Sequence, residues 1–213
     1  MMKTRMDLSN WNRLEHYNFY KDFAEPYFGL TTQLDCTTLY RHVKENEESF
    51  FLRYMHASGW AVNQVENFRL RQEDEGVFKY DTIHISTTVG RPDNTFGFSF
   101  IPFQEKWESF LPTALQEVER VKNTSGLAIT EKTNRLDTVH YSTIPWANFT
   151  SITNARQFSI PDSIPKILFG KCDKSSDRQL MSVAVYINHS LADAYHIGQY
   201  LEALQEVFHK PLP

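Results

Sequence analysis

The spacing of apolar residues changes period close to the C-terminal end of the chain. Residues 180–187 read LMSVAVYI, a nearly continuous apolar run rich in branched residues, which is typical of a strand buried on both faces. From Asp193 onward, apolar side chains recur at steps of three and four residues, which predicts one face of a helix. His189 therefore stands at the end of a buried strand, just before a helix begins.

Other segments carry the periods of both helices and strands. Helices are expected after Asp35, which is an N-cap candidate, over residues 50–65 and along residues 107–121. Strands are expected at 68–71 and 77–87, which would form a hairpin, and at 95–103, 138–152 and 166–172. Pro145 must end or interrupt the strand in which it lies. These elements follow no regular βαβ order, so the pattern predicts an α+β layered sandwich.

Composition narrows the class of protein. The 213 residues are 41% hydrophobic and 23% charged, which is enough apolar material for a sizeable core. A net charge of −4 and a pI near 6.1 argue against nucleic acid or an anionic membrane as the main partner. No apolar run approaches the length of a membrane span, so we expect a soluble cytoplasmic protein. Cys36 and Cys172 form no recognisable metal or disulfide framework.

The histidine at the strand end has three interpretations. Taken alone, His189 is a core histidine bonded to backbone, and Asp193 is the N-cap of the next helix. A metal site would recruit His189, Asp193 and His196, but no cysteine cluster or HExxH pattern supports it, and no metal is expected. The third hypothesis makes His189 a general base, because an imidazole of ordinary basicity can take a proton from a hydroxyl.

Five segments, in order along the chain, resemble one enzyme family. Residues 188–205, NHSLADAYHIGQYLEALQ, are similar to the H-x-x-x-D-G signature of the chloramphenicol acetyltransferases, which other CoA-dependent acyltransferases share. Four further segments resemble other motifs of the family: NWNRLEHYNFY (10–20), LTTQLDCTTL (30–39), VNQVENFRLR (62–71) and STIPWANFTSI (142–152). The order and spacing of the matches extend the resemblance over nearly the whole chain.

The resemblance implies a fold, an assembly and a reaction. The fold would be a two-layer α/β sandwich with a mixed sheet packed by helices, in a single domain over residues 1–213. The assembly would be a homotrimer with each active site at a subunit interface. The reaction would move an acetyl group from acetyl-CoA, the co-substrate, to a hydroxyl of chloramphenicol by direct attack, an activity that confers antibiotic resistance.

Individual site residues follow from the same resemblance. His189 matches the family's catalytic histidine. Asp193 matches an aspartate that pairs with an arginine, and Arg13 matches that arginine. Ser142 matches a serine that donates a hydrogen bond to the tetrahedral oxyanion. The binding positions are Lys171 and Trp146 on the coenzyme side, and Tyr20, Phe28, Phe96 and Leu168 around the acceptor.

The chain also departs from the family pattern. Leu168 stands where the family has a threonine, and Ala194 stands where it has a glycine. Further changes fall at Ser49 and Phe51 on the coenzyme side and at Ala24 and Pro26 near the acceptor. The catalytic positions match while the acceptor surroundings differ, which leaves three hypotheses. These are a chloramphenicol O-acetyltransferase, a CoA-dependent O-acyltransferase for another hydroxylated acceptor, and a non-catalytic trimeric binding homologue.

Overall fold

The computed structural model describes residues 2–157, 161–173 and 177–213. The helices are α1 (Leu14–Tyr20), α2 (Thr37–Glu45), α3 (Phe50–Gln64), α4 (Trp107–Lys122) and α5 (Ala194–His209), with short 3-10 helices η1 (Glu66–Arg69) and η2 (Glu131–Asn134). The strands are β1 (Lys3–Arg5), β2 (Tyr27–Asp35), β3 (Leu70–Glu73), β4 (Gly76–Tyr80), β5 (His84–Gly90), β6 (Phe96–Phe98), β7 (Thr138–Thr143), β8 (Lys166–Asp173) and β9 (Leu180–Asn188).

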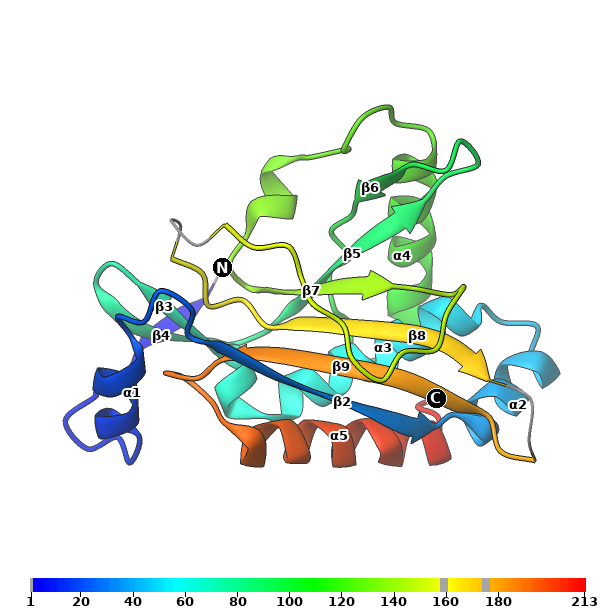
Figure 1. Ribbon diagram of the computed structural model, residues 1–213. Coiled ribbons are helices and arrows are strands. Elements are labelled where there is room, and N and C mark those ends of the chain that lie inside the picture. The colour runs from blue at the N-terminus through cyan, green and yellow to red at the C-terminus, as the bar shows by residue number, and fades with distance from the viewer. Residues whose placement is uncertain (1, 158–160, 174–176) are drawn as a thin grey trace.

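The strands form one large mixed sheet and one small antiparallel sheet (Figure 1). In the large sheet the order is β2-β9-β8-β7-β5-β6. The pairs β5–β7 and β7–β8 are parallel, and the remaining pairs are antiparallel. The small sheet has the order β1-β4-β3. β9 lies between β2 and β8, and most of its side chains are buried, as its continuous apolar run predicts.

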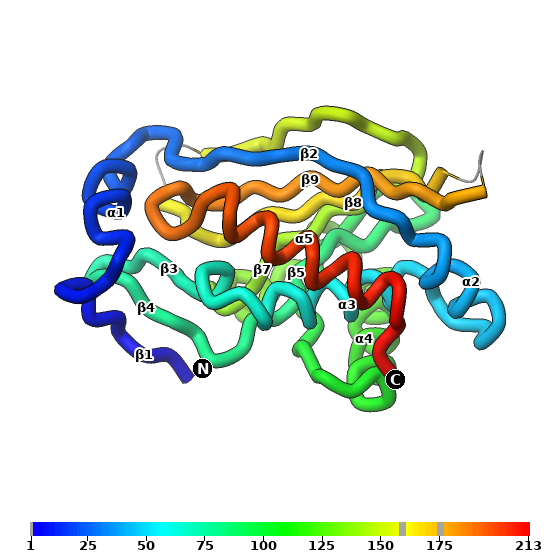
Figure 2. The backbone as a smooth tube through the Cα atoms, turned by 90° about the horizontal axis from the view of Figure 1, so that it is seen from below, coloured from blue at the N-terminus to red at the C-terminus, as the bar shows by residue number. Residues whose placement is uncertain are grey.

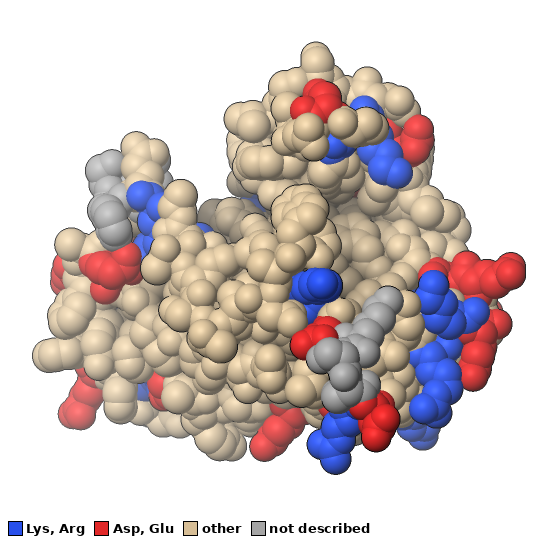
Figure 3. Space-filling model, turned by 45° about the vertical axis from the view of Figure 1, so that its right-hand side comes forward, with Lys and Arg blue, Asp and Glu red and all other residues tan. Residues whose placement is uncertain are grey.

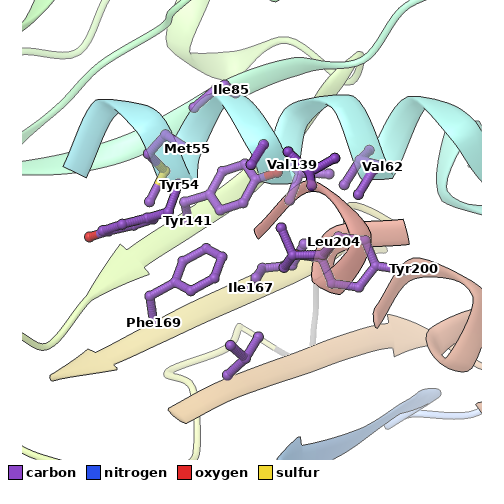
Figure 4. Packing of buried hydrophobic residues seen from close by; sticks show 14 of the residues in the cluster. Tyr54, Met55, Val62, Ile85, Val139, Tyr141, Ile167, Phe169, Tyr200 and Leu204 are labelled. Carbon is purple, nitrogen blue, oxygen red and sulfur yellow. The ribbon is translucent and has the colours of Figure 1, made fainter. Parts of the chain in front are cut away.

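Helices α3 and α5 lie side by side against one face of the large sheet (Figure 2). Between the two layers, aromatic and aliphatic side chains from both helices meet those of β7 and β8 (Figure 4). Tyr141 and Phe169 lie parallel there with ring centroids 6.3 Å apart, and Phe169 is fully buried. Burying one such side chain contributes roughly 1.5–3 kcal/mol to folding. The predicted two-layer sandwich of a mixed sheet and helices is confirmed.

A long connection after β7 covers part of the opposite face of the sheet (Figure 1). It is held by main-chain contacts: Lys171 N–H donates to the Ala147 carbonyl at 2.9 Å, and Phe149 N–H donates to Ser182 Oγ at 3.3 Å. The Tyr186 hydroxyl donates to the carbonyl of Ile152. This face therefore carries a mixture of polar contacts, in contrast to the apolar face beneath the helices.

Arg71 ties the small sheet to the large one. Its side chain is fully buried and donates to the carbonyls of Leu136 at 2.7 Å and Thr138 at 2.6 Å, where β7 begins. Burial lowers the pKa of Arg71 to about 10, so the guanidinium keeps its charge at neutral pH. The carbonyl contacts compensate for removing that charge from water.

Most expected elements are present, with four corrections. The predicted helices coincide with α2, α3, α4 and α5, but the N-cap of α2 is Cys36 and not Asp35, whose carboxylate accepts from Thr37 N–H at 2.9 Å. The hairpin exists as β3 and β4, but the expected strand 77–87 is two strands in different sheets. The expected strand 95–103 shortens to β6, and the expected strand 138–152 ends at Thr143, before Pro145.

No helix in the described part of the chain is long and apolar enough to cross a membrane.

Candidate active site

His189 lies in the turn that joins β9 to α5. Its backbone N–H donates to the Pro26 carbonyl at 2.8 Å, which fixes the turn against the segment that precedes β2. On the side chain, Nδ1 lies 3.1 Å from the Ala192 carbonyl oxygen. Because a carbonyl oxygen only accepts, Nδ1 carries the proton in this contact and Nε2 presents a lone pair. The half-buried ring therefore has a defined tautomer with one basic nitrogen available.

Two aromatic side chains hold the imidazole ring in place. The Tyr20 ring stacks on it with centroids 4.2 Å apart and an interplanar angle of 10°. The Phe28 ring, on β2, packs against the same imidazole with ring centroids 4.3 Å apart and an interplanar angle of 34°. Both residues were predicted to line an acceptor pocket, and the structure brings both into contact with His189. These contacts restrict rotation of the ring, which preserves the orientation of Nε2.

Arg13 and Asp193 form an ion pair beneath the same turn. The Arg13 side chain is only 8% exposed, and its Nη2 donates to the His189 carbonyl at 3.3 Å. Asp193 is also the N-cap of α5, where it accepts from Tyr195 N–H at 3.0 Å. Burial acts to raise the pKa of Asp193, but the hydrogen bond and charge of Arg13 outweigh it and lower the pKa. The pair joins the N-terminal region to the histidine turn.

Ser142 lies in a different part of the chain, on the sheet face away from α3 and α5. It pairs with Leu168 across β7 and β8, and both side chains line a pocket of ≈ 390 Å³. Phe96, on β6, contributes another wall and is 48% exposed. Three of the predicted site residues therefore share one pocket, but they do not surround His189.

The distance between the two groups follows from strand geometry. Ser142 is level with Leu168 on β8, which is level with Ala184 on β9, and His189 lies five residues further along. Two strand spacings and five residues of rise place the Ser142 and His189 backbones about 20 Å apart. Within one chain, the two side chains cannot act on the same atom.

The two coenzyme candidates, Lys171 and Trp146, lie close to each other. Lys171 lines a second pocket, of ≈ 540 Å³, together with Tyr54 and Thr143. Its backbone N–H bonds to Ala147, the residue next to Trp146. The Trp146 side chain is 83% exposed, so the folded chain itself does not bury it.

The Ser142 pocket holds polar residues that the sequence analysis missed. His140 and Lys166 are directly paired across β7 and β8, and both line the pocket. Lys166 forms an ion pair with Asp162, and burial, together with the charge of Lys166, lowers the pKa of His140 to about 4. Period-two alternation along the strands places His140 on the face of Ser142, and this signal was available in the sequence.

Within the described ranges of the chain, no group of three or more histidine, cysteine, aspartate or glutamate side chains is arranged to hold a metal ion.

Comparison of folds defines the class of protein. A solved structure titled as a probable dihydrolipoamide acetyltransferase from Listeria monocytogenes has a TM-score of 0.68 at 15% identity, over 93% of this chain and 90% of that chain. At this identity the likeness concerns the fold alone. A second solved structure, a chloramphenicol acetyltransferase, has a TM-score of 0.89 at 25% identity and covers 98% of this chain and 100% of that chain. The fold is thus that of acetyltransferase domains.

Sequence comparison narrows the class to one family. Residues 1–205 match the chloramphenicol acetyltransferase family, and the chain belongs to it. Chloramphenicol acetyltransferase 3 of Escherichia coli is 27% identical over the full length of both chains. A chloramphenicol acetyltransferase of Staphylococcus aureus is 25% identical over 97% of this chain and 96% of its own. The protein is therefore an acyltransferase, and the family uses acetyl-CoA as co-substrate. The hypothesis of a non-catalytic homologue is wrong.

Proposed function

We propose that this protein transfers acetyl from acetyl-CoA to a hydroxyl of chloramphenicol, with His189 as general base. The observation that carries the proposal is the hydrogen bond from Nδ1 of His189 to the Ala192 carbonyl, because it leaves Nε2 as the proton acceptor. Nε2 takes the hydroxyl proton as the acceptor oxygen attacks the thioester carbonyl. When the tetrahedral intermediate collapses, the imidazolium returns that proton to the departing thiolate of CoA.

Ser142 has a separate role in this mechanism. Its hydroxyl donates to the oxyanion of the tetrahedral intermediate, and one such donor is worth roughly 3–4 kcal/mol of transition-state stabilisation. Asp193 and Arg13 act indirectly, since their ion pair positions the turn that carries His189. Lys171 and Trp146 would border the coenzyme, and Tyr20, Phe28, Phe96 and Leu168 the acceptor.

A homotrimer with shared sites reconciles these roles with the separation of about 20 Å between Ser142 and His189 within one chain. In a ring of identical subunits, His189 of one protomer meets Ser142 of the next. Figure 3 shows wide areas without charged side chains, although one basic side chain lies near the middle of the view, and such uncharged areas support association. Light scattering should give about 75 kDa, three times the chain mass of 25.0 kDa.

A related acceptor is the second candidate. The pocket of Ser142 is also lined by His140 and by Lys166, which forms an ion pair with Asp162, and these polar side chains suit an acceptor that carries polar groups. Leu168 lines the same pocket and offers no hydroxyl to an ordered water. The chemistry at His189 would be unchanged with such an acceptor.

One assay tests the leading proposal. Purified protein is incubated with acetyl-CoA and chloramphenicol, and release of the CoA thiol is followed over time. His189→Ala should abolish transfer, whereas His16→Ala, an exposed histidine on α1, should leave the rate unchanged. Near-wild-type turnover in His189→Ala would exclude this residue as the base. Transfer to other hydroxylated acceptors, but not to chloramphenicol, would favour the second candidate.

A further inference from the structure

The only two cysteines of the chain meet in the folded structure. Cys36 Sγ and Cys172 Sγ lie 3.3 Å apart, although the residues are 136 positions apart in the sequence. Both contact the main hydrophobic core, Cys36 as a fully buried member and Cys172 as a partly buried neighbour. A disulfide has an S–S distance near 2.05 Å, so bond formation requires the sulfurs to approach by about 1.2 Å.

A β-bulge brings Cys172 to this position. Phe169 pairs with Val183 and Cys172 pairs with Met181, so β8 advances by three residues where β9 advances by two. In a regular strand, residues three apart point to opposite faces. The extra residue turns Cys172 toward the core face that Phe169 occupies, and toward Cys36.

The backbone at Cys36 is fixed from the other side of β9. Cys36 lies between the end of β2 and the start of α2. Its backbone N–H donates to the carbonyl of Gln179, the residue before β9, at 2.8 Å. The two cysteines therefore approach each other from strands that flank β9.

Only one of the two cysteines reaches a pocket at the surface. Cys172 lines the pocket of ≈ 540 Å³ that also contains Lys171 and Tyr40, whereas Cys36 has no exposed surface. The hydrogen bond with Cys172, together with burial, raises the pKa of the Cys36 thiol. A reagent from solution therefore meets Cys172 first.

We propose that Cys36 and Cys172 are a redox modification site that forms a reversible internal disulfide, with Cys172 as the first thiol to react and Cys36 as the resolving thiol. The oxidant is a low-molecular-weight disulfide. The Cys172 thiolate attacks one sulfur of the oxidant, which forms a mixed disulfide and releases one thiol. Cys36 then loses its proton and attacks the Cys172 sulfur, which forms the internal bond and releases the second thiol. Two protein thiols are oxidised and one disulfide is reduced.

The bond would join two walls of the same pocket. Tyr40 stands on α2, just after Cys36, and Lys171 stands on the bulge beside Cys172. The disulfide would fix the start of α2 to this end of β8 and so limit changes in the width of the pocket. It would also raise the midpoint of thermal unfolding, because it closes a long loop in the unfolded chain.

The experiment compares three folded proteins under native conditions. Reduced wild type, Cys36→Ala and Cys172→Ala are incubated with glutathione disulfide, remaining thiols are alkylated, and the peptides are identified by mass spectrometry. Wild type should fall from two thiols per chain to none, with one internal disulfide and a higher unfolding midpoint that dithiothreitol reverses. Cys36→Ala should stop at one glutathione on Cys172, and Cys172→Ala should keep Cys36 reduced.

Three results would overturn the proposal. One is a wild-type chain that keeps glutathione on Cys172 beside a reduced Cys36. Another is a disulfide between two chains in place of the internal one. The third is an absence of reaction in wild type and in Cys36→Ala, which would show that Cys172 is closed to the oxidant. Acetyl transfer plays no part in any of these measurements, so their outcome is separate from that of the proposed function.

Discussion

Chains that each lack one half of the proposed site should restore each other's activity. Ser142 and His189 lie about 20 Å apart in one chain, so Ser142→Ala and His189→Ala damage different halves of a site that two protomers would share. In a mixed ring, some sites combine the intact His189 of one variant with the intact Ser142 of the other. These sites are chemically wild type.

The expected magnitude follows from counting. In an equal mixture, the subunit that supplies position 189 to a site carries the intact His189 in half of the cases. The neighbour that supplies position 142 carries the intact Ser142 in half of the cases as well. About a quarter of the sites are then intact, and the mixture should show about a quarter of wild-type activity. Removing one oxyanion donor costs about 10²–10³-fold in rate, so the mixture should exceed the Ser142→Ala parent by roughly 25- to 250-fold.

The assay requires exchange of subunits. The two variants, with different affinity tags, are unfolded and refolded together, and release of the CoA thiol is measured per chain. Parents that are refolded separately and then mixed serve as the control and should show only the mean activity of the two parents. If chains with both tags copurify, yet the mixture is no more active than the mean of its parents, the shared site is refuted.

Three further predictions concern the Arg13–Asp193 ion pair and two single positions. Asp193→Asn and Arg13→Val should each lower the free energy of unfolding measured in urea. In the double variant the two effects should differ from their sum by about 0.5–3 kcal/mol, and simple additivity would contradict the ion pair. Because the folded-state pKa of Asp193 is lowered, this contribution is present above the ordinary aspartate pKa near 3.8 and is lost as pH falls below it. Leu168→Thr should raise kcat for chloramphenicol by roughly two- to tenfold, since one neutral hydrogen bond is worth about 0.5–1.5 kcal/mol; an unchanged kcat at saturating acetyl-CoA would favour another acceptor. His140→Phe should flatten the fall in stability between pH 6.5 and about 4, because the unfolded histidine binds a proton there and the folded one does not; an unaltered pH profile would contradict the neutral state of the folded histidine.

The sequence pattern predicted helices α2 to α5 and the buried strand β9, but it missed α1, β1 and β2. The segment YFGLTTQLD alternates correctly, with Phe28 and Leu30 directed to the core, yet Gly29 and its polar neighbours lower the strand propensity. The structure explains the glycine: a Cβ at position 29 would lie 2.5 Å from the Tyr186 ring on β9. A residue chosen for its cross-strand neighbour gives no local signal.

The sequence pattern anticipated only part of the arrangement of the candidate site residues. His189, Asp193 and Arg13 meet as expected, because the turn and the N-cap that position two of them are local features. Ser142 is found in a separate pocket, since its distance from His189 depends on the order of strands in the sheet. Strand order is set by contacts between distant segments, and hydrophobic periodicity along one chain does not report it.

The position of β9 in the sheet has a consequence for synthesis of the protein. β2 leaves the ribosome well before β9, which begins at Leu180. In the large sheet, however, β2 pairs with β9. Until β9 emerges and inserts between β2 and β8, Phe28 and Leu30 have no completed sheet on which to pack. The nascent chain therefore holds β2 unpaired through most of translation, which leaves the apolar side chains of Phe28 and Leu30 open to aggregation and to chaperones. The histidine turn then forms as the last strand closes the sheet.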